Sequence, residues 1–165
     1  YERYEISNYA KKGYACRHNC GYWQRKNYVG FGIGAASLKE NVRFRNGTDL
    51  DGYLQDPLGC REEVQVLSRQ EQMEEFMFLG LRMTEGVSPA EFGHLFGHSM
   101  EEVYGKVIRN NVEDGLLQYL EEPNSDAVKP GSQEGGVVKP TDGMRLALTD
   151  RGLDLSNYVM AQFLL

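Results

Sequence analysis

The 165-residue sequence lacks any apolar run long enough to cross a bilayer, which takes about 18 successive residues. It also lacks a positively charged start followed by an apolar stretch, so no secretory signal is expected. Cysteine is scarce, and the odd number of cysteines (Cys16, Cys20 and Cys60) argues against a disulfide framework. Together these absences predict a cytoplasmic protein with no integral membrane segment.

An excess of basic residues is missing as well. Residues 60–165 carry nine Lys and Arg against eighteen Asp and Glu, whereas residues 1–59 carry nine against six. Proteins that bind nucleic acid non-specifically need a basic face that displaces counterions from the phosphates. We therefore expect no nucleic-acid partner, and the contrast in charge indicates two parts with different surroundings.

Large aliphatic residues are rare in residues 1–59, which are rich in Gly, Tyr and Asn. This set is too small for a core of its own: Ile6, Val29, Ile33, Leu38, Val42, Leu50 and Leu54. We expect this part to lean on further sequence, and the start at Tyr1 rather than Met suggests a piece of a longer chain. A short strand is predicted over residues 4–7, and a glycine-rich strand or loop over 27–34.

From residue 60 the apolar pattern becomes helical. Three serines precede apolar runs, and each is followed three residues later by Glu, as helix N-caps often are: Ser68, Ser88 and Ser99. The first predicted helix covers residues 70–83. Each helix is expected to stop at a glycine, which suits the position after a last turn: Gly86, Gly97 and Gly115.

Two segments of strand length follow, residues 116–120 and 145–149, and a last helix begins near Thr149. Residues 121–144 between the strands are polar and rich in Pro, Gly and Ser, which predicts an exposed loop. Three helices, two strands and a further helix are the order of a winged helix, with 121–144 as the wing loop. The third helix carries more acidic than basic residues, which argues against reading of DNA.

The richest stretch in possible metal ligands places Cys16, His18 and Cys20 at alternate positions. In an extended segment all three side chains would point to one side, and zinc accepts thiolates and imidazoles, but a fourth ligand at finger spacing is missing. The Cys-x3-Cys-x2-Cys motif of radical S-adenosylmethionine (SAM) enzymes is incomplete, because its third position is Trp23. On residue chemistry alone, His18 is either a haem ligand beside Tyr22 and Trp23 or a structural histidine packed among aromatic rings.

Several separated motifs, in this order, resemble the oxygen-independent coproporphyrinogen III oxidase-like family of radical SAM proteins. They are Tyr4-Glu5-Ile6-Ser7-Asn8-Tyr9-Ala10-Lys11, His18-Asn19-x-x-Tyr22-Trp23, Tyr28-x-Gly30-x-Gly32-x-Gly34-Ala35-x-Ser37, Glu74-Glu75-Phe76-x-x-Leu79-Gly80-Leu81-Arg82-x-Thr84-Glu85-Gly86 and Leu146-x-Leu148-Thr149-x-x-Gly152-x-x-x-Ser156-Asn157. The resemblance covers nearly the whole chain except the 121–144 loop.

The resemblance implies an α+β protein in which residues 1–59 form the tail of a partial radical SAM barrel. Residues 60–165 would then be a winged-helix-like, mostly helical C-terminal domain that covers the barrel mouth. In this family an N-terminal radical SAM core, outside this chain, holds SAM and a [4Fe-4S] cluster on three cysteines. The fragment alone is therefore not expected to be catalytic.

Two branches of the family fit, and a third interpretation is an interaction domain with a bare winged helix. The His-Asn-x-x-Tyr-Trp motif favours the haem chaperone branch, which binds haem and delivers it to a recipient protein. The alternative is the branch that makes protoporphyrinogen IX by oxidative decarboxylation of coproporphyrinogen III.

The resemblance implies haem-binding roles for His18, Asn19, Tyr22 and Trp23, with His18 as the axial ligand. Cys20 lies inside the motif and is a possible thiolate ligand. Gly32 and Gly34 either line the cofactor cavity or allow close strand packing.

Overall fold

The structure, a computed structural model, describes residues 1–121 and 143–164. Residues 1–66 form two small sheets and two short helices: β1 (Glu2–Arg3), β2 (Tyr9–Ala10), α1 (Arg17–Trp23), β3 (Ala36–Lys39), β4 (Val42–Asn46), α2 (Leu50–Gln55) and β5 (Arg61–Val66). The remainder is mostly helical: α3 (Arg69–Gly80), α4 (Pro89–Phe96), α5 (Met100–Glu113), β6 (Leu117–Glu121), β7 (Met144–Leu148), α6 (Asp150–Asp154) and α7 (Ser156–Ala161). No helix in these two ranges is long and apolar enough to cross a membrane.

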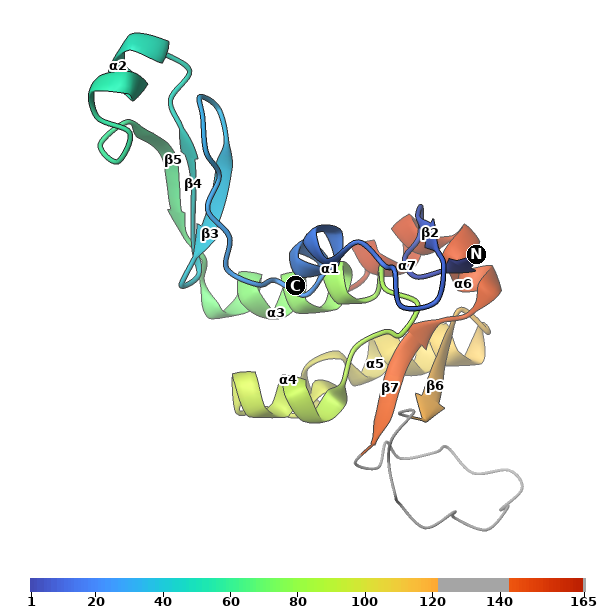
Figure 1. The fold of residues 1–165 in the computed structure, drawn as a ribbon. Coiled ribbons are helices and arrows are strands. Elements are labelled where there is room, and N and C mark those ends of the chain that lie inside the picture. Colours follow the sequence, from blue (N-terminus) through green and yellow to red (C-terminus); the bar gives the residue numbers. More distant parts are fainter. Residues whose placement is uncertain (122–142, 165) are drawn as a thin grey trace.

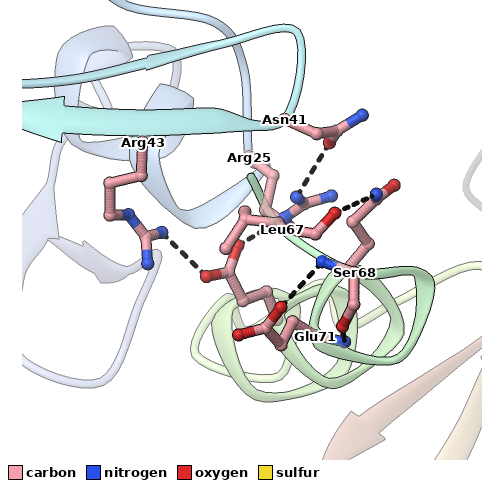
Figure 2. A network of polar contacts seen from close by, with 8 residues as sticks. Arg25, Asn41, Arg43, Leu67, Ser68 and Glu71 are labelled. Atoms are coloured by element: carbon pink, nitrogen blue, oxygen red, sulfur yellow. Dashed lines mark hydrogen bonds and ion pairs between the residues drawn. The ribbon is translucent and has the colours of Figure 1, made fainter. Parts of the chain in front are cut away.

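The three predicted helix caps are present. The side chains of Ser68, Ser88 and Ser99 each accept a hydrogen bond from the backbone N–H three residues later. Glu71 and Glu102 close capping boxes by accepting from the backbone N–H of Ser68 and Ser99, and these hydrogen bonds lower the pKa of both carboxyl groups. Figure 2 includes the first of these boxes, at the start of α3.

The core lies among the helices and β6–β7. Its aromatic side chains, all buried except the partly buried Phe76, form a row of ring contacts that runs from α3 to the C-terminal end: Phe76, Phe92, Phe96, Tyr104 and Phe163. In contrast, residues 1–59 bury only Leu38 and Phe44 among their hydrophobic side chains. The expectation that this part has too few aliphatic residues for a core agrees with the structure.

The strands and last helix of the C-terminal part differ in detail from the sequence prediction. β6 and β7 pair antiparallel, with Leu117 opposite Leu148, as expected for the two strands. The last helix divides into α6 and α7, because Leu155 (φ −106°, ψ 22°) leaves helical geometry between them. The predicted wing loop falls mainly on residues 122–142, which lie outside the described residues.

The helix predicted over residues 70–83 is shorter than expected. α3 ends at Gly80, and Gly86 has another role than stopping it. Gly86 has φ +68°, and a Cβ atom there would overlap the Leu146 carbonyl oxygen. The next residue, Val87, exchanges two backbone hydrogen bonds of 2.8 Å with Leu146, so the segment before α4 adds a short bridge to β7.

Sequence analysis missed the three-stranded sheet β3-β4-β5. Glu40 and Asn41 join β3 to β4 with φ of 51° and 63°, the backbone of a two-residue type I′ hairpin turn. β5 then pairs with β4. In Figure 1 this sheet and α2 form an arm that extends away from the helices, beyond the start of α3.

Two further details concern residues 1–66. The strand predicted over residues 4–7 was wrong, because the Glu5 carboxylate accepts from Ser7 N and Asn8 Nδ2 and folds this stretch into a turn between β1 and β2. The expected division after residue 59 passes through a sheet, since β5 lies beyond it and pairs with β4. The division of the chain into domains stays a prediction.

We predict that Gly86→Ala is far more destabilising than Gly115→Ala. Both glycines have positive φ, which costs alanine about 1 kcal/mol, but only Gly86 also faces backbone atoms of β7. The added overlap should cost about 1–3 kcal/mol more. Urea unfolding of the two variants measures this difference, and equal losses would contradict the proposed contact.

Candidate functional site

The His-Asn-x-x-Tyr-Trp motif lies on helix α1 and not on an extended segment. Cys16 is its N-cap, and the amide of Cys20 donates to the Cys16 carbonyl at 3.0 Å. Side chains four residues apart share one face of a helix. The helix therefore separates the motif into two pairs, His18 with Tyr22 and Asn19 with Trp23.

The first face of α1 presents a row of rings. The His18 and Tyr22 rings meet edge to face at 4.7 Å between centroids, and Tyr22 meets Tyr28 at 4.6 Å. Tyr28 is held by backbone hydrogen bonds with Leu38 of β3, and burial raises the pKa of its hydroxyl. Within the described residues, the exposed His18 imidazole makes this ring contact and no hydrogen bond or ion pair.

The second face of α1 is fastened by a cation. The Arg82 guanidinium lies over the Trp23 ring, 4.2 Å from its centroid. Arg82 also pairs with the fully buried carboxylate of Glu5, at 3.4 Å between Nη2 and Oε2. Arg82 thus joins its own motif to the motif with Glu5 and to the motif with Trp23.

A second buried carboxylate, that of Glu75, binds Arg25, which lies two residues after the end of α1. Glu75 of α3 accepts from Arg25 Nε at 2.9 Å and pairs with Arg43 Nη2 at 2.8 Å. Arg25 also donates to Asn41 Oδ1 at 3.1 Å, as drawn in Figure 2. Residue 25 has a positive φ of 51°, which is uncommon for a residue other than glycine.

A cleft of about 610 Å³ opens beside the Trp23 face. Trp23 lines it together with apolar side chains from α3, α4 and the segment between them. The lining also includes charged residues, and the side chains of both kinds include Trp23, Lys26, Phe76, Met83, Glu85, Val87, Glu91, Leu95 and Arg145. The Trp23 Nε1 atom is buried and has no hydrogen-bond partner in the described part of the chain. His18, Asn19 and Tyr22 do not line this cleft.

Gly32 and Gly34, the two glycines considered for a cofactor cavity, lie in the loop before β3 and do not line this cleft. The Gly32 amide donates to the Tyr53 hydroxyl at 2.9 Å, and Asn46 Nδ2 donates to the Gly32 carbonyl at 2.9 Å. Gly32 and Gly34 have φ of +94° and +67°, and a Cβ atom at Gly32 would meet nothing within 4 Å. Backbone conformation rather than close packing therefore accounts for glycine at position 32.

The three cysteines are free thiols, and two of them, Cys16 and Cys20, lie one helical turn apart. Across residues 1–121 and 143–164, no group of three His, Cys, Asp or Glu side chains is placed to hold a metal ion. These residues fit neither the zinc interpretation nor a [4Fe-4S] cluster. Burial, followed by the charge of Glu85, raises the pKa of the Cys20 thiol, which disfavours a thiolate ligand there.

Residues 67–122 match the family described as the HemN C-terminal domain. Over its whole length the chain is 33% identical to the Heme chaperone HemW of Lactococcus lactis subsp. lactis (strain IL1403), of which it covers 38%. Over 72% of its length it is 37% identical to the Heme chaperone HemW of Bacillus subtilis (strain 168), of which it covers 32%. The chain belongs to the radical SAM family of HemN and HemW. The resemblance inferred from the motifs is therefore confirmed.

The fold agrees with membership of the HemN and HemW family. The chain resembles the structure of coproporphyrinogen III oxidase (HemN) from Escherichia coli, a radical SAM enzyme, with a TM-score of 0.54 and 16% sequence identity. The likeness covers 84% of this chain and 28% of that enzyme, and at this identity it shows the fold alone. The chain spans about a third of the length of these HemN and HemW relatives.

Four side chains of this candidate site were not predicted from the sequence. Tyr28 extends the ring row, and Arg25, Glu5 and Arg82 fasten α1. A signal existed for Tyr28, Glu5 and Arg82, because all three belong to the motifs quoted above. The pairing of Glu5 with Arg82 across 77 residues has no local signal in the sequence.

We predict that Arg82→Gln destabilises the chain by about 3 kcal/mol, because the fully buried Glu5 carboxylate loses its cation. Trp23 is the only tryptophan in the chain, so its emission maximum should shift as well. Arg109→Gln is the control, since the Arg109–Glu101 pair is exposed and should contribute less than about 1 kcal/mol. Urea unfolding followed by fluorescence measures the stability of both variants. An unmoved midpoint in Arg82→Gln would refute the stabilising role of the Arg82–Glu5 pair.

We also predict that Cys20 is alkylated by iodoacetamide more slowly than the exposed Cys16 at pH 8. The raised pKa of Cys20 leaves less thiolate at this pH, and its rate should still be rising above pH 8.5, about the ordinary pKa of cysteine. Mass spectrometry of timed digests gives both rates. Faster labelling of Cys20 would contradict the assignment.

Proposed function

We propose that the chain is the C-terminal part of a radical SAM haem chaperone, which binds haem and delivers it to a recipient protein. The observation that carries the proposal is the exposed His18 imidazole beside the Tyr22 and Tyr28 rings, on a helix fastened from its other side. A neutral imidazole is a common iron ligand in proteins, and it is free for one here in the described residues. HemW relatives that bear the name heme chaperone support this choice.

The surroundings of His18 suit a flat macrocycle. Tyr22 and Tyr28 offer apolar ring surface next to the imidazole, and such burial supplies most of the affinity for a large planar ligand. Asn19 and Trp23 lie on the other pair of helix positions, so their proposed contribution is to a haem edge or to the cleft. Gly32 and Gly34 are proposed to line the cofactor cavity of the radical SAM barrel, together with residues outside this chain.

In this proposal the SAM molecule and the [4Fe-4S] cluster belong to an N-terminal radical SAM core of the same protein. The cluster and SAM supply radical chemistry when they are bound. The described residues of this chain do not provide the three thiolate ligands that the cluster needs. The role of this chain would be to hold haem and to present it. The recipient would be a haem-dependent protein.

The finer description of the fold is part of the same proposal. The order α3, α4, α5, β6, β7 is that of a winged helix, and the Val87–Leu146 bridge supplies the short strand such a fold has before its second helix. We propose that this winged-helix-like domain covers the mouth of the radical SAM barrel and that residues 1–59 are the barrel tail. The acidic α5 surface supports a packing role rather than a nucleic-acid role.

His18→Ala should weaken haem binding at least ten-fold and shift the Soret band, because the axial imidazole is removed. Haem titration of the full-length chaperone, followed by absorbance, measures the dissociation constant and the spectrum. His98→Ala is the matched control, since His98 is also exposed but lies before α5, and it should stay within two-fold.

An unchanged spectrum and affinity in His18→Ala would sink the ligand assignment. If Cys20→Ala alone changed the spectrum, the ligand would be a thiolate. A protein that binds no haem but decarboxylates coproporphyrinogen III would be the oxidase, the alternative member of the family.

A further inference from the structure

Glu75 is a buried acid in the middle of α3, with a side chain only 7% exposed. Both of its carboxylate oxygens are engaged by guanidinium groups from other elements, Arg25 at Oε2 and Arg43 at Oε1. Figure 2 shows Arg25 and Arg43 converging on α3 from different segments. A buried carboxylate with two cationic partners is stable only while both remain in place.

One of these partners controls the end of helix α1. The Arg25 amide donates to the Tyr22 carbonyl at 3.1 Å, and the next amide, of Lys26, donates to Gly21 at 2.9 Å. The chain turns at this point with the positive φ of residue 25. The residue whose backbone ends α1 thus also carries the guanidinium that donates hydrogen bonds to Glu75 and Asn41.

The other partner connects the arm. Arg43 is on β4, and Asn41 belongs to the turn between β3 and β4, whose strand β3 holds Tyr28 by its backbone. The same carboxylate therefore sets the distance between α1 and strand β3, to which the segment with Tyr28, the last ring of the row, is hydrogen-bonded. None of the Glu75 contacts includes His18 itself.

We propose that Glu75 is a positioning residue for the haem motif: through Arg25 and Arg43 it fixes α1 so that the His18–Tyr22 pair meets the Tyr28 ring. This inference rests on the proposed haem function, because a fixed position of His18 matters only if His18 binds haem. Glu75 touches no reacting group and acts only through the elements it holds.

An exposed ion pair on the same arm provides a matched control. Arg45 and Glu63 lie 2.7 Å apart, with side chains 41% and 67% exposed, whereas Arg25 is 11% exposed. Neutralising Glu63 leaves its partner in water. Neutralising Glu75 leaves Arg25 buried without its anion, so only this change should release α1.

The first test needs no haem. Hydrogen exchange followed by mass spectrometry compares Glu75→Gln, Glu63→Gln and the unchanged protein. In Glu75→Gln, peptides covering residues 17–26 should exchange at least ten-fold faster, while peptides of α5 stay within two-fold. Uniform acceleration, including α5, would mean a general loss of stability and would overturn the proposal, as would unchanged exchange in 17–26.

The second test separates this inference from the proposed function. Haem release is measured in Glu75→Gln, in His18→Ala and in the double variant. Release should be at least ten-fold faster in Glu75→Gln, and adding Glu75→Gln to His18→Ala should change release by less than two-fold, because Glu75 acts through His18. A further ten-fold effect in that background would overturn the positioning role.

If His18→Ala leaves haem release unchanged, the haem function fails while the exchange test still decides whether Glu75 holds α1. Should Glu75→Gln not fold, Arg25→Lys takes its place. Lysine keeps the charge but cannot reach both Glu75 and Asn41 with a forked group, so exchange in 17–26 should again rise ten-fold. Unchanged exchange there would overturn the proposal.

Discussion

The buried carboxylate of Glu75 holds together parts of the chain that have little else in common. Residues 1–59 bury few apolar side chains, so the hydrophobic effect alone attaches them weakly to the helical core. The ion pairs of Glu75 and the Glu5–Arg82 pair supply defined contacts instead. Such pairs are sensitive to geometry, and in the proposed haem function that property would keep the exposed histidine of α1 in one orientation.

Helix α1 shows how one short motif serves two purposes. The exposed His18 and the half-buried Tyr22 form a row of rings with Tyr28, whereas Trp23 is covered by Arg82 and lines the cleft. A six-residue sequence motif suggests one site, but helical spacing distributes its members over two faces. Membership of the HemN and HemW family agrees with both the motif and the fold around it.

Sequence reasoning succeeded where the determining interactions are local. The serine caps, the glycine after α4 and the order of helices and strands all depend on residues within four positions of one another. It failed for the arm, although Val42-Arg43-Phe44-Arg45 alternates and Asn41 favours a turn, because the glycine-rich surroundings masked that signal. It could not find the Glu75 and Glu5 pairs, since Glu75 lies 50 and 32 residues from Arg25 and Arg43, Glu5 lies 77 residues from Arg82, and no local rule connects them.

Position 25 illustrates a conflict between backbone and side chain. Glycine adopts a φ of 51° with the least strain, so a search for stabilising substitutions based on backbone angles would choose it here. Arginine instead accepts a strain of about 1 kcal/mol and keeps the group that Glu75 and Asn41 bind. Relief of the strain and retention of the contact are therefore incompatible at this residue: a carboxylate on helix α3 favours arginine where the backbone favours glycine.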